Sequence, residues 1–257
     1  MPSDGILSPV PVDHFGERVA ERYDASVDAE FETSEVEAAV GFLARLAGSG
    51  PALELGIGTG RIALPLGARG IRVHGIDLST AMVARLRAKP GGQDIGVTIG
   101  DFAEAAVDNR FSLAYLVFNT IMNLTSQDEQ VACFRNVARH LEPGGHFVIE
   151  VLVPDLQRLP VGETIRAYTV TPSRLSFDEY DVVTQSVVSH HYRTLDGALD
   201  VRSIPFRYAW PAELDLMARL AGMTLVERWA GWGREPFTSE SAKHVSVWRA
   251  DEIEADR

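Results

Sequence analysis

The feature that most constrains the fold is a regular alternation of short apolar segments and amphipathic segments between residues 52 and 153. It predicts strands over residues 52–55, 72–76, 96–99, 111–118 and 146–153, with helices over residues 61–68, 79–89 and 126–140. The last helix opens on a capping box, in which Ser126 is followed three residues later by Glu129. Strands that alternate with helices are typical of a parallel sheet with right-handed crossovers, so an α/β fold is expected.

The pattern changes after Pro154, where only strand-like alternation is found. Four strands are predicted over residues 165–170, 175–181, 184–194 and 198–208, with the hairpin signal Asp196-Gly197 before the last one. We interpret this stretch as an antiparallel β-meander inserted after the fifth strand. A helix over residues 212–220 and strands over residues 223–229 and 244–249 then complete a seven-stranded mixed sheet with helices on both faces.

The segments before and after these strands give the expected division of the chain. Helices are predicted over residues 15–29 and 33–46, after a loose segment of about 13 residues, and the chain ends in an acidic tail over residues 251–257. The expected units are an N-terminal helical cap (1–50), a sheet core (51–158), an inserted β subdomain (159–210), and the closing helix and strands of the core (211–257). The inserted subdomain is expected to cover an acceptor or to form a homodimer contact.

Composition excludes several function classes. The formal net charge is −12, without a run of basic residues, which argues against a nucleic-acid partner. The first residues have no basic or apolar stretch, so no signal peptide is expected, and no apolar run reaches the roughly 20 residues of a membrane helix. The only cysteine, Cys133, permits no internal disulfide, which fits a cytoplasmic protein. No cluster of residues has metal-ligand spacing, so no metal is expected.

A glycine-rich loop between the first strand and the next helix is the strongest site signal. It has the sequence Glu54-Leu-Gly-Ile-Gly-Thr-Gly60 and is followed by Arg61. Glycines allow close approach of the backbone to a ligand, and the helix N-terminus offers free N–H groups. Dinucleotide-binding enzymes use a similar loop, but their motif places Gly or Ala where this chain has Arg61.

Two carboxylates follow the next two strands. Asp77 ends Gly75-Ile-Asp77, where a carboxylate can accept hydrogen bonds from both ribose hydroxyls; helix capping before Ser79 is its alternative role. Asp101 and Phe102 follow the third strand and would supply an acceptor and an aromatic wall for an adenine ring. An ordinary loop carboxylate is the alternative for Asp101.

Together these motifs resemble those of the class I, Rossmann-like methyltransferases that use S-adenosylmethionine (SAM), over residues 23–153 and in the closing elements. Leu141-Glu-Pro-Gly-Gly145 matches the turn before the family's fifth strand. The resemblance implies SAM as cofactor, with the methionine moiety on Gly56, Gly58 and Gly60, the ribose on Asp77, and the adenine among Leu78, Met82, Asp101 and Phe102. Glu54, Ile57, Arg61 and Phe118 complete the expected cofactor site. Tyr23 resembles the family's N-terminal tyrosine, which closes over the cofactor or the acceptor; core packing is its alternative role.

The acceptor side is less specific, because SAM brings its own electrophile and the protein mainly aligns the reactants. The catalytic candidates are Tyr23, Asn119 at the end of the fourth strand, Glu150 in the fifth strand, and His191 in the meander. Asn119 can orient an acceptor but is not a base, and a buried pairing role is the alternative for Glu150. Since neighbouring residues of a strand point to opposite faces, only one of His190 and His191 can face the site. Tyr168, Arg207, Tyr208, Trp210 and Trp232 are further contacts, most of them expected in the core.

The resulting prediction is O- or N-methylation of a metabolite or natural-product intermediate. Three alternatives stay open: a SAM-binding enzyme that catalyses a cyclisation or rearrangement, a non-catalytic SAM-binding protein, and a dinucleotide-dependent dehydrogenase. The intact glycine loop disfavours the second alternative, and Arg61 with Gly100-Asp101-Phe102 disfavours the third.

Overall fold

We describe a computed structural model, which defines residues 16–28, 33–195 and 197–251. Four sequence predictions lie wholly or partly outside these residues. They are the loose N-terminal segment, the start of the first helix at Phe15, the Asp196 position of the hairpin turn, and the acidic tail beyond residue 251.

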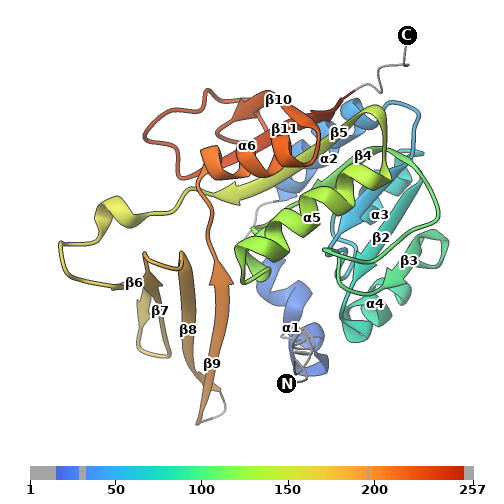
Figure 1. Ribbon diagram of the computed structural model, residues 1–257. Helices are drawn as coiled ribbons and strands as arrows, with labels where there is room; N and C mark the ends of the chain where they lie inside the picture. Colours follow the sequence, from blue (N-terminus) through green and yellow to red (C-terminus); the bar gives the residue numbers. More distant parts are fainter. Residues whose placement is uncertain (1–15, 29–32, 196, 252–257) are drawn as a thin grey trace, which may run out of the picture.

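Sheet A has seven strands in the order β10-β11-β5-β4-β1-β2-β3 (Figure 1). The pairs among β1 to β5 are parallel, whereas β11 runs antiparallel to both β5 and β10. The predicted Rossmann-like, mixed seven-stranded sheet is therefore confirmed. Its strands are β1 (Ala52–Leu55), β2 (Val73–Asp77), β3 (Gly96–Ile99), β4 (Phe111–Leu116), β5 (Leu141–Leu152), β10 (Met223–Trp229) and β11 (Lys243–Ala250).

Helices cover both faces of sheet A, because its strands carry apolar side chains on both sides. On one face, Phe134 of α5 and Leu214 of α6 belong to a core cluster with Phe147 and Trp248 of the sheet. On the other face, α2 and the start of α3 pack on the alternate residues of the same strands. The helices are α1 (Glu17–Asp28), α2 (Thr33–Ala47), α3 (Ala63–Ala68), α4 (Thr80–Arg87), α5 (Gln127–His140) and α6 (Pro211–Leu220).

Two element boundaries of sheet A differ from the prediction, one at the carboxyl end of β4 and one at the amino end of β5. The fourth strand ends at Leu116 rather than at residue 118, because Phe118 and Asn119 adopt left-handed backbone conformations with φ of 54° and 62°. A short 3-10 helix, η2 (Thr120–Asn123), follows directly. The fifth strand begins earlier than predicted, at Leu141, since the expected turn over residues 141–145 is part of an irregular pairing with β4.

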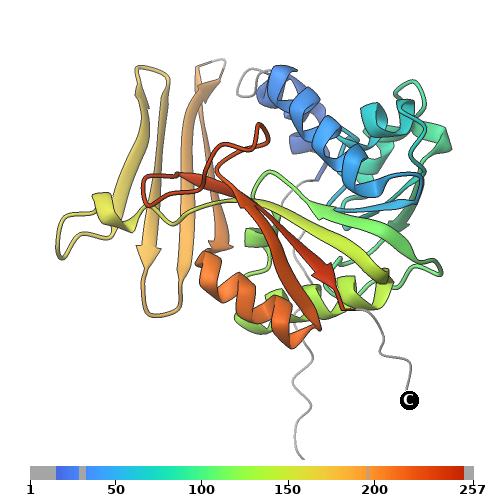
Figure 2. The same ribbon diagram turned by 90° about the horizontal axis from the view of Figure 1, so that it is seen from above.

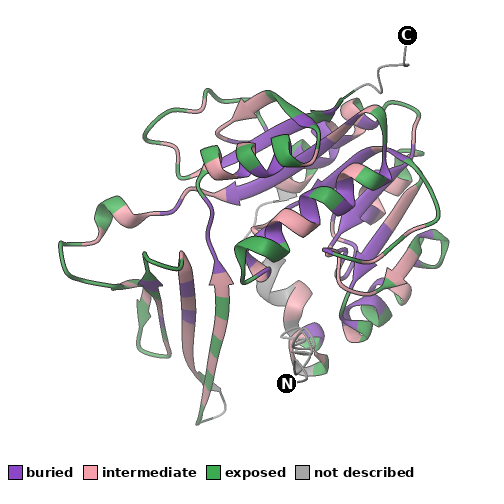
Figure 3. Cartoon of the chain, viewed as in Figure 1, coloured by how far each residue is buried: buried purple, intermediate pink, exposed green. Residues whose placement is uncertain are grey.

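The inserted meander forms a separate four-stranded sheet, sheet B, in the order β6-β7-β8-β9 with antiparallel pairs throughout. Figures 1 and 2 both place sheet B beyond the end of β5, beside the N-terminal helices. Its residues are largely exposed or intermediate, in contrast to the buried strands of sheet A (Figure 3). The strands are β6 (Ile165–Thr171), β7 (Arg174–Asp181), β8 (Ser186–Leu195) and β9 (Ala198–Arg207).

The two faces of sheet B differ in chemistry, because cross-strand partners share a face and neighbours along a strand do not. One face, which we call the polar face, carries Arg166, Tyr168, Arg174, Ser176, Asp178, Ser189, His191, Arg193, Asp200 and Arg202. The opposite, apolar face carries Ile165, Val170, Leu175, Phe177, Val188, Tyr192, Leu199 and Val201. His190 stacks on Phe177 of the apolar face, whereas His191 contacts Tyr168 of the polar face, so the two histidines point to opposite sides as predicted.

The additional contact residues of the variable region are divided between core and surface. Arg207, Tyr208 and Trp232 are buried, whereas Tyr168 and Trp210 are exposed. The three buried side chains therefore belong to the packing of the molecule, and Tyr168 is the one of the five that lies on the polar face of sheet B.

Candidate cofactor and acceptor site

Most of the predicted cofactor residues follow the carboxyl ends of neighbouring strands. The glycine loop follows β1, Asp77 ends β2, Asp101 and Phe102 follow β3, and Phe118 follows β4. In sheet A these strands are neighbours and run parallel, so their ends meet at one edge (Figure 1). Ligands of open α/β sheets bind at this edge, which makes it the candidate site.

The glycine loop is held tightly between β2 and η2. The amides of Gly56 and Ile57 donate to the Ile76 carbonyl at 2.8 and 3.1 Å. Gly56 has a φ of 71°, and a Cβ atom there would lie 2.7 Å from Thr120 Cγ2, so a larger residue fits neither the conformation nor the space. Gly58 and Gly60 have φ values of 53° and 80°. The loop thus offers side-chain-free backbone to a ligand, as a SAM-binding loop requires.

Asp77 fixes the same loop from the next strand. Its two carboxylate oxygens accept the amides of Gly58 at 2.6 Å and of Ser79 at 2.8 Å. The side chain that caps α4 is Ser79, whose hydroxyl accepts the Met82 amide at 3.3 Å. A carboxylate accepts hydrogen bonds at both oxygens, which is the chemistry that the two hydroxyls of a ribose require.

The residues expected around the adenine lie at the ends of β2 and β3. Leu78 is exposed and Met82 is buried beneath the loop, with its terminal methyl 3.3 Å from the place of a Cβ atom on Gly58. Asp101 accepts the Ala103 amide at 2.8 Å, and the half-buried Phe102 packs on the core. These four side chains combine an apolar surface with a polar acceptor at neighbouring strand ends.

Glu54 is buried beneath the loop rather than exposed to a ligand. It accepts the Tyr115 hydroxyl at 2.9 Å and the Ala63 amide at the start of α3. Burial raises the pKa of the Glu54 carboxyl to about 8 and that of the Tyr115 hydroxyl well above its usual value. Glu54 therefore supports the loop from behind.

Helix α1 covers the loop from the N-terminal side. The half-buried Tyr23 lies near Arg61, Asp77 and Glu54, and burial raises the pKa of its hydroxyl. The next residue, Asp24, accepts the Thr59 hydroxyl at 2.5 Å and pairs with Lys89 at 2.8 Å. We did not predict this attachment. The sequence offers one indication of it, since Lys89 is one of only two lysines in the chain and lies just after α4.

Phe118 and Arg61 close the other side of the loop. The guanidinium carbon of Arg61 lies 4.9 Å from the centre of the Phe118 ring, a cation–π contact. The left-handed conformation of Phe118 and Asn119 turns the chain sharply after β4, at the place where ligands bind in this topology.

Asn119 and Glu150 both bind the backbone of this turn. The Asn119 side-chain oxygen accepts the Leu152 amide at 2.7 Å. One Glu150 oxygen accepts the Phe118 amide at 3.2 Å, and the other pairs with Lys243 at 3.1 Å. Lys243 also pairs with Glu35 of α2. These contacts give both residues a structural role, and for Glu150 they match the buried pairing role that we considered.

The fourth catalytic candidate, His191, lies in a different part of the molecule. It belongs to the polar face of sheet B, where its ring nitrogens lie 3.3 to 3.5 Å from Tyr168, Ser176 and Ser189 oxygens. The structure thus brings Tyr23, Asn119 and Glu150 to the edge of sheet A and leaves His191 on the wall beyond it.

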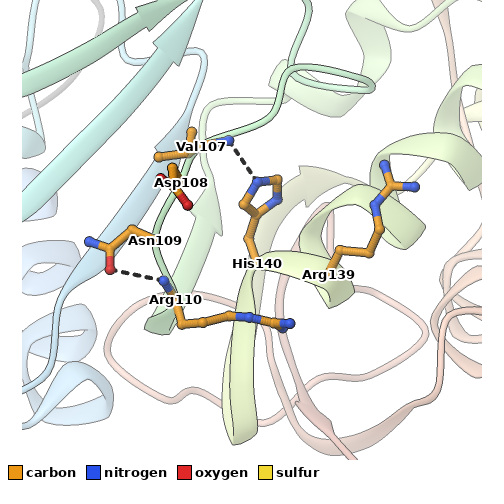
Figure 4. Close-up of a pocket in the computed structure, with 6 residues that line it drawn as sticks. All are labelled: Val107, Asp108, Asn109, Arg110, Arg139 and His140. Atoms are coloured by element: carbon orange, nitrogen blue, oxygen red, sulfur yellow. Dashed lines mark hydrogen bonds between the residues drawn. The ribbon is translucent and has the colours of Figure 1, made fainter.

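A separate polar pocket lies at the opposite, amino end of β4. It has a volume of about 410 Å³ and is lined by Val107, Asp108, Asn109, Arg110, Arg139 and His140 (Figure 4). His140 bridges the pocket wall, accepting the Val107 amide at 2.9 Å and bonding the Asn136 carbonyl at 2.8 Å. The pocket shares no residue with the predicted cofactor site.

Residues 16–28, 33–195 and 197–251 have two further properties. None of the helices there is both long and apolar enough to cross a membrane. Within the same residues, no three His, Cys, Asp or Glu side chains are grouped so that they could hold a metal ion.

Comparison with known proteins identifies the family. A methyltransferase-domain model matches residues 52–145. Cypemycin N-terminal methyltransferase from Streptomyces sp is 30% identical over 203 residues, which are 76% of this chain and 81% of that protein. The CcbJ methyltransferase from Streptomyces caelestis is 37% identical with a TM-score of 0.82, covering 92% of this chain and 98% of CcbJ. SAM-bound CalS10, an amino pentose methyltransferase from Micromonospora echinaspora, shares the fold at 20% identity and a TM-score of 0.67, covering 88% and 95% of the two chains. The chain belongs to the class I SAM-dependent methyltransferases, and its cofactor is SAM.

Proposed function

We propose that this enzyme transfers the SAM methyl group to the nitrogen of an amine on a small natural-product acceptor. The observation that carries the proposal is the chemistry of the polar face of sheet B, which presents hydroxyls, an imidazole and the carboxylate of Asp178. The arginines of this face other than Arg166 lie farther along the strands, at Arg174, Arg193 and Arg202, so Asp178 is nearer to the end attached to the core. An ammonium group carries only hydrogen-bond donors and a positive charge, so acceptors and a carboxylate suit it.

The similar proteins support an amine rather than a hydroxyl. The relative that is 30% identical is named as an N-terminal methyltransferase, and an N-terminus is an amine. Among the structures that share the fold are an amino pentose methyltransferase and a sugar N-methyltransferase. The net charge of −12 also favours the approach of a cation over that of an anion.

On the cofactor side, we propose the residue roles that the family resemblance implies. Gly56, Gly58 and Gly60 would hold the methionine moiety, Asp77 the ribose, and Leu78, Met82, Asp101 and Phe102 the adenine. SAM supplies the electrophilic methyl group, so the protein would align the acceptor and exclude water. An ammonium acceptor must also lose one proton before its nitrogen can attack the methyl carbon. The contacts of Glu54, Asn119 and Glu150 with the loop and the turn after β4 would keep these groups in place.

The experiment is a product assay with matched acceptors. The protein is incubated with SAM and either a pentapeptide with a free N-terminal alanine or 3-amino-3-deoxyglucose, and S-adenosylhomocysteine (SAH) and the methylated product are measured. Each amine has a control in which a hydroxyl replaces the amino group. We expect SAH and N-methyl product from at least one amine and from neither hydroxyl control. Turnover of the hydroxyl compounds alone would disprove amine specificity.

We also propose the wider setting of the enzyme. In this proposal residues 159–210, which contain sheet B, cover the acceptor and residues 1–50 cover SAM. Residues 51–158 and 211–257 together form the core that holds sheet A. A reducing compartment such as the cytoplasm suits the single cysteine, since Cys133 is buried and burial raises the pKa of its thiol. Sedimentation of the full chain at several concentrations tests whether the enzyme is a homodimer.

A further inference from the structure

The polar face of sheet B contains buried hydroxyl groups that the pairing of its strands does not need. Ser176 is 0% and Ser189 7% exposed, although both lie in a sheet whose other face is largely open. The Ser189 hydroxyl lies 2.9 Å from the Tyr168 hydroxyl and 3.3 Å from His191 Nε2, and Ser176 lies 3.4 Å from His191 Nδ1. Packing alone would be served as well by Val or Ala, so this network points to recognition.

Asp178 is the charged member of the network. It lies directly across from Ser189 in the β7–β8 pairing, and the Tyr180 hydroxyl donates to it at 3.3 Å. Arg166, which lies across from it on β6, is engaged by Asp155 of the segment after β5. Among the residues that the structure describes, Asp178 forms no ion pair. Arg166 and His190 stabilise its charge at longer range, but among the described residues no cation lies within ion-pair distance of this half-buried carboxylate.

The polar face begins where β4 and β5 end. Tyr180 and Val187 of this face belong to the same hydrophobic cluster as Ile121 and Met122 of η2, and η2 follows Phe118 and Asn119 at the site. The ion pair between Arg166 and Asp155 attaches the same face to the segment that leaves β5. Asp178 and Ser189 form the next row of the polar face after Tyr180 and Val187, and His191 lies in the row after that.

We propose that Asp178 is the counter-ion for the ammonium group of the acceptor, with Tyr168, Ser189 and His191 as its hydrogen-bonding partners. This inference rests on the proposed function, because only an amine acceptor arrives as a cation. The carboxylate binds the ammonium form and holds the nitrogen on the polar face of sheet B. Before methyl transfer the ammonium releases one proton to water, and the free amine then attacks the methyl carbon as its bond to the SAM sulfur breaks. A hydroxyl acceptor gains nothing from the charge, so Asp178 makes the wall selective for amines.

A binding role and a purely structural role for Asp178 predict opposite effects of its substitution on stability. Burial raises the pKa of the Asp178 carboxyl, so its ionised form destabilises the folded state at neutral pH. The folded state binds the Asp178 proton more tightly than the unfolded state does. The free energy of unfolding therefore increases as the pH falls toward the raised pKa of this carboxyl. An uncharged Asn of the same shape should therefore leave the melting temperature unchanged or higher, whereas loss of a structural contact would lower it.

The test compares Asp178→Asn with Glu179→Gln. Glu179 is the next residue of β7, is exposed, and points to the apolar face, where it lies 3.5 Å from His190. The full-length proteins, saturated with SAH, are titrated by calorimetry with the N-terminal alanine pentapeptide and with 3-amino-3-deoxyglucose. We expect Asp178→Asn to weaken amine binding roughly 10- to 100-fold, the effect of losing a charged hydrogen bond. SAH affinity and melting temperature should stay the same or rise, and Glu179→Gln should behave like the wild type.

The outcomes separate the two proposals. If the wild type binds and methylates an amine and Asp178→Asn binds it equally well, the Asp178 subsite is disproved and amine methylation stands. If Asp178→Asn loses amine binding together with SAH binding and thermal stability, Asp178 is structural and the subsite is also disproved. If the wild type neither binds nor methylates either amine, the proposed function itself fails.

Discussion

Sheet A and sheet B differ in how far their strands are buried and in what holds them in place. All four residues of β1 are buried, and the few polar side chains beneath the loop, such as Glu54, are paired within the protein. In β9 most residues are exposed or intermediate, and its sheet has one polar and one apolar face. Sheet A is fixed by packing on both sides, whereas sheet B is fixed mainly by its strand pairing and by its attachment near η2.

This difference suggests where changes affect binding and where they affect folding. At the cofactor edge, the proposed ligand-binding groups also hold the backbone: Asp77 accepts the amide of Gly58 in the loop and that of Ser79 at the start of α4. A substitution there should disturb loop and ligand together. On the sheet B wall the polar groups bind mostly one another, so substitutions should change acceptor binding with little effect on stability.

The largest expected effect is that of Asp77→Ala on cofactor binding. The substitution removes the acceptor of the Gly58 amide and the proposed partner of the ribose, which should weaken SAH binding by roughly 2–4 kcal/mol. Calorimetry with SAH measures this directly. Ser79→Ala is the control, because it removes the cap of α4 and should cost about 1 kcal/mol of stability with little loss of SAH affinity. Equal SAH affinity of Asp77→Ala and wild type would refute the proposed ribose contact.

Gly75→Ala tests whether packing positions the loop. Gly75 lies in β2 beneath the loop, and a Cβ atom there would lie 2.3 to 2.7 Å from three atoms of the Ile57 side chain. We expect a loss of roughly 1–3 kcal/mol of stability from overpacking, together with weaker SAH binding. Gly67→Ala in α3 is the matched control, since no atom lies within 4 Å of its added Cβ and the helix should gain roughly 0.5–1 kcal/mol. Thermal unfolding with and without SAH distinguishes them; a Gly75→Ala protein as stable as Gly67→Ala would show that the loop is not held this way.

Glu54→Gln should change the pH dependence of stability. The pKa of Glu54 is raised from 4.5 to about 8 in the folded protein, so the folded state keeps a proton that the unfolded state releases. Stability should therefore decrease as the pH rises between about 5 and 8, with a contribution of about 1.4 kcal/mol per pH unit where linkage is complete. Urea unfolding from pH 5 to 9 should show this slope in the wild type and in a Glu37→Gln control on the exposed surface of α2. In Glu54→Gln the slope should be smaller; an unchanged slope would mean that Glu54 is ionised in the folded state.

The smallest effect is expected on the apolar face of sheet B. Tyr192 stacks on Phe177 with ring centres 5.9 Å apart, so Tyr192→Ala should cost about 1 kcal/mol of stability. Because Tyr192 points away from the polar face, amine binding by the SAH-bound protein should be unchanged. Calorimetry on Tyr192→Ala and on His191→Gln compares neighbouring residues of opposite faces. Reduced amine binding in Tyr192→Ala alone would place the acceptor on the apolar face and contradict the comparison of the two sheets.

The sequence predicted the topology of sheet A because each strand of the core is an apolar run next to a turn or helix signal. The site at its edge followed from the same order, since the glycines and Asp77 lie at strand ends. The meander was also predicted, as was the opposite direction of His190 and His191, because strand periodicity alone determines both.

Contacts between distant residues were the part that the sequence did not reveal. No local pattern shows that Asn119 accepts an amide 33 residues away or that Lys243 joins Glu35 to Glu150. The left-handed turn at Phe118 and Asn119 was also missed, because its conformation is imposed by partners from β5 rather than by glycine. No motif marks the polar face of sheet B or Asp178 in the sequence, because the proposed role of Asp178 depends on its cross-strand neighbours.

The two lysines of the chain add a consequence for the N-terminal helices. Lys89 holds α1 through Asp24, and Lys243 joins α2 to β5 through Glu35 and Glu150. The Lys89 and Asp24 side chains are 31% and 43% exposed, so dissolved ions weaken their attraction, whereas the hydrophobic contacts of sheet A are not screened. The ionic strength of the medium should therefore set how firmly α1 closes over the glycine loop, and with it how quickly cofactor and product exchange.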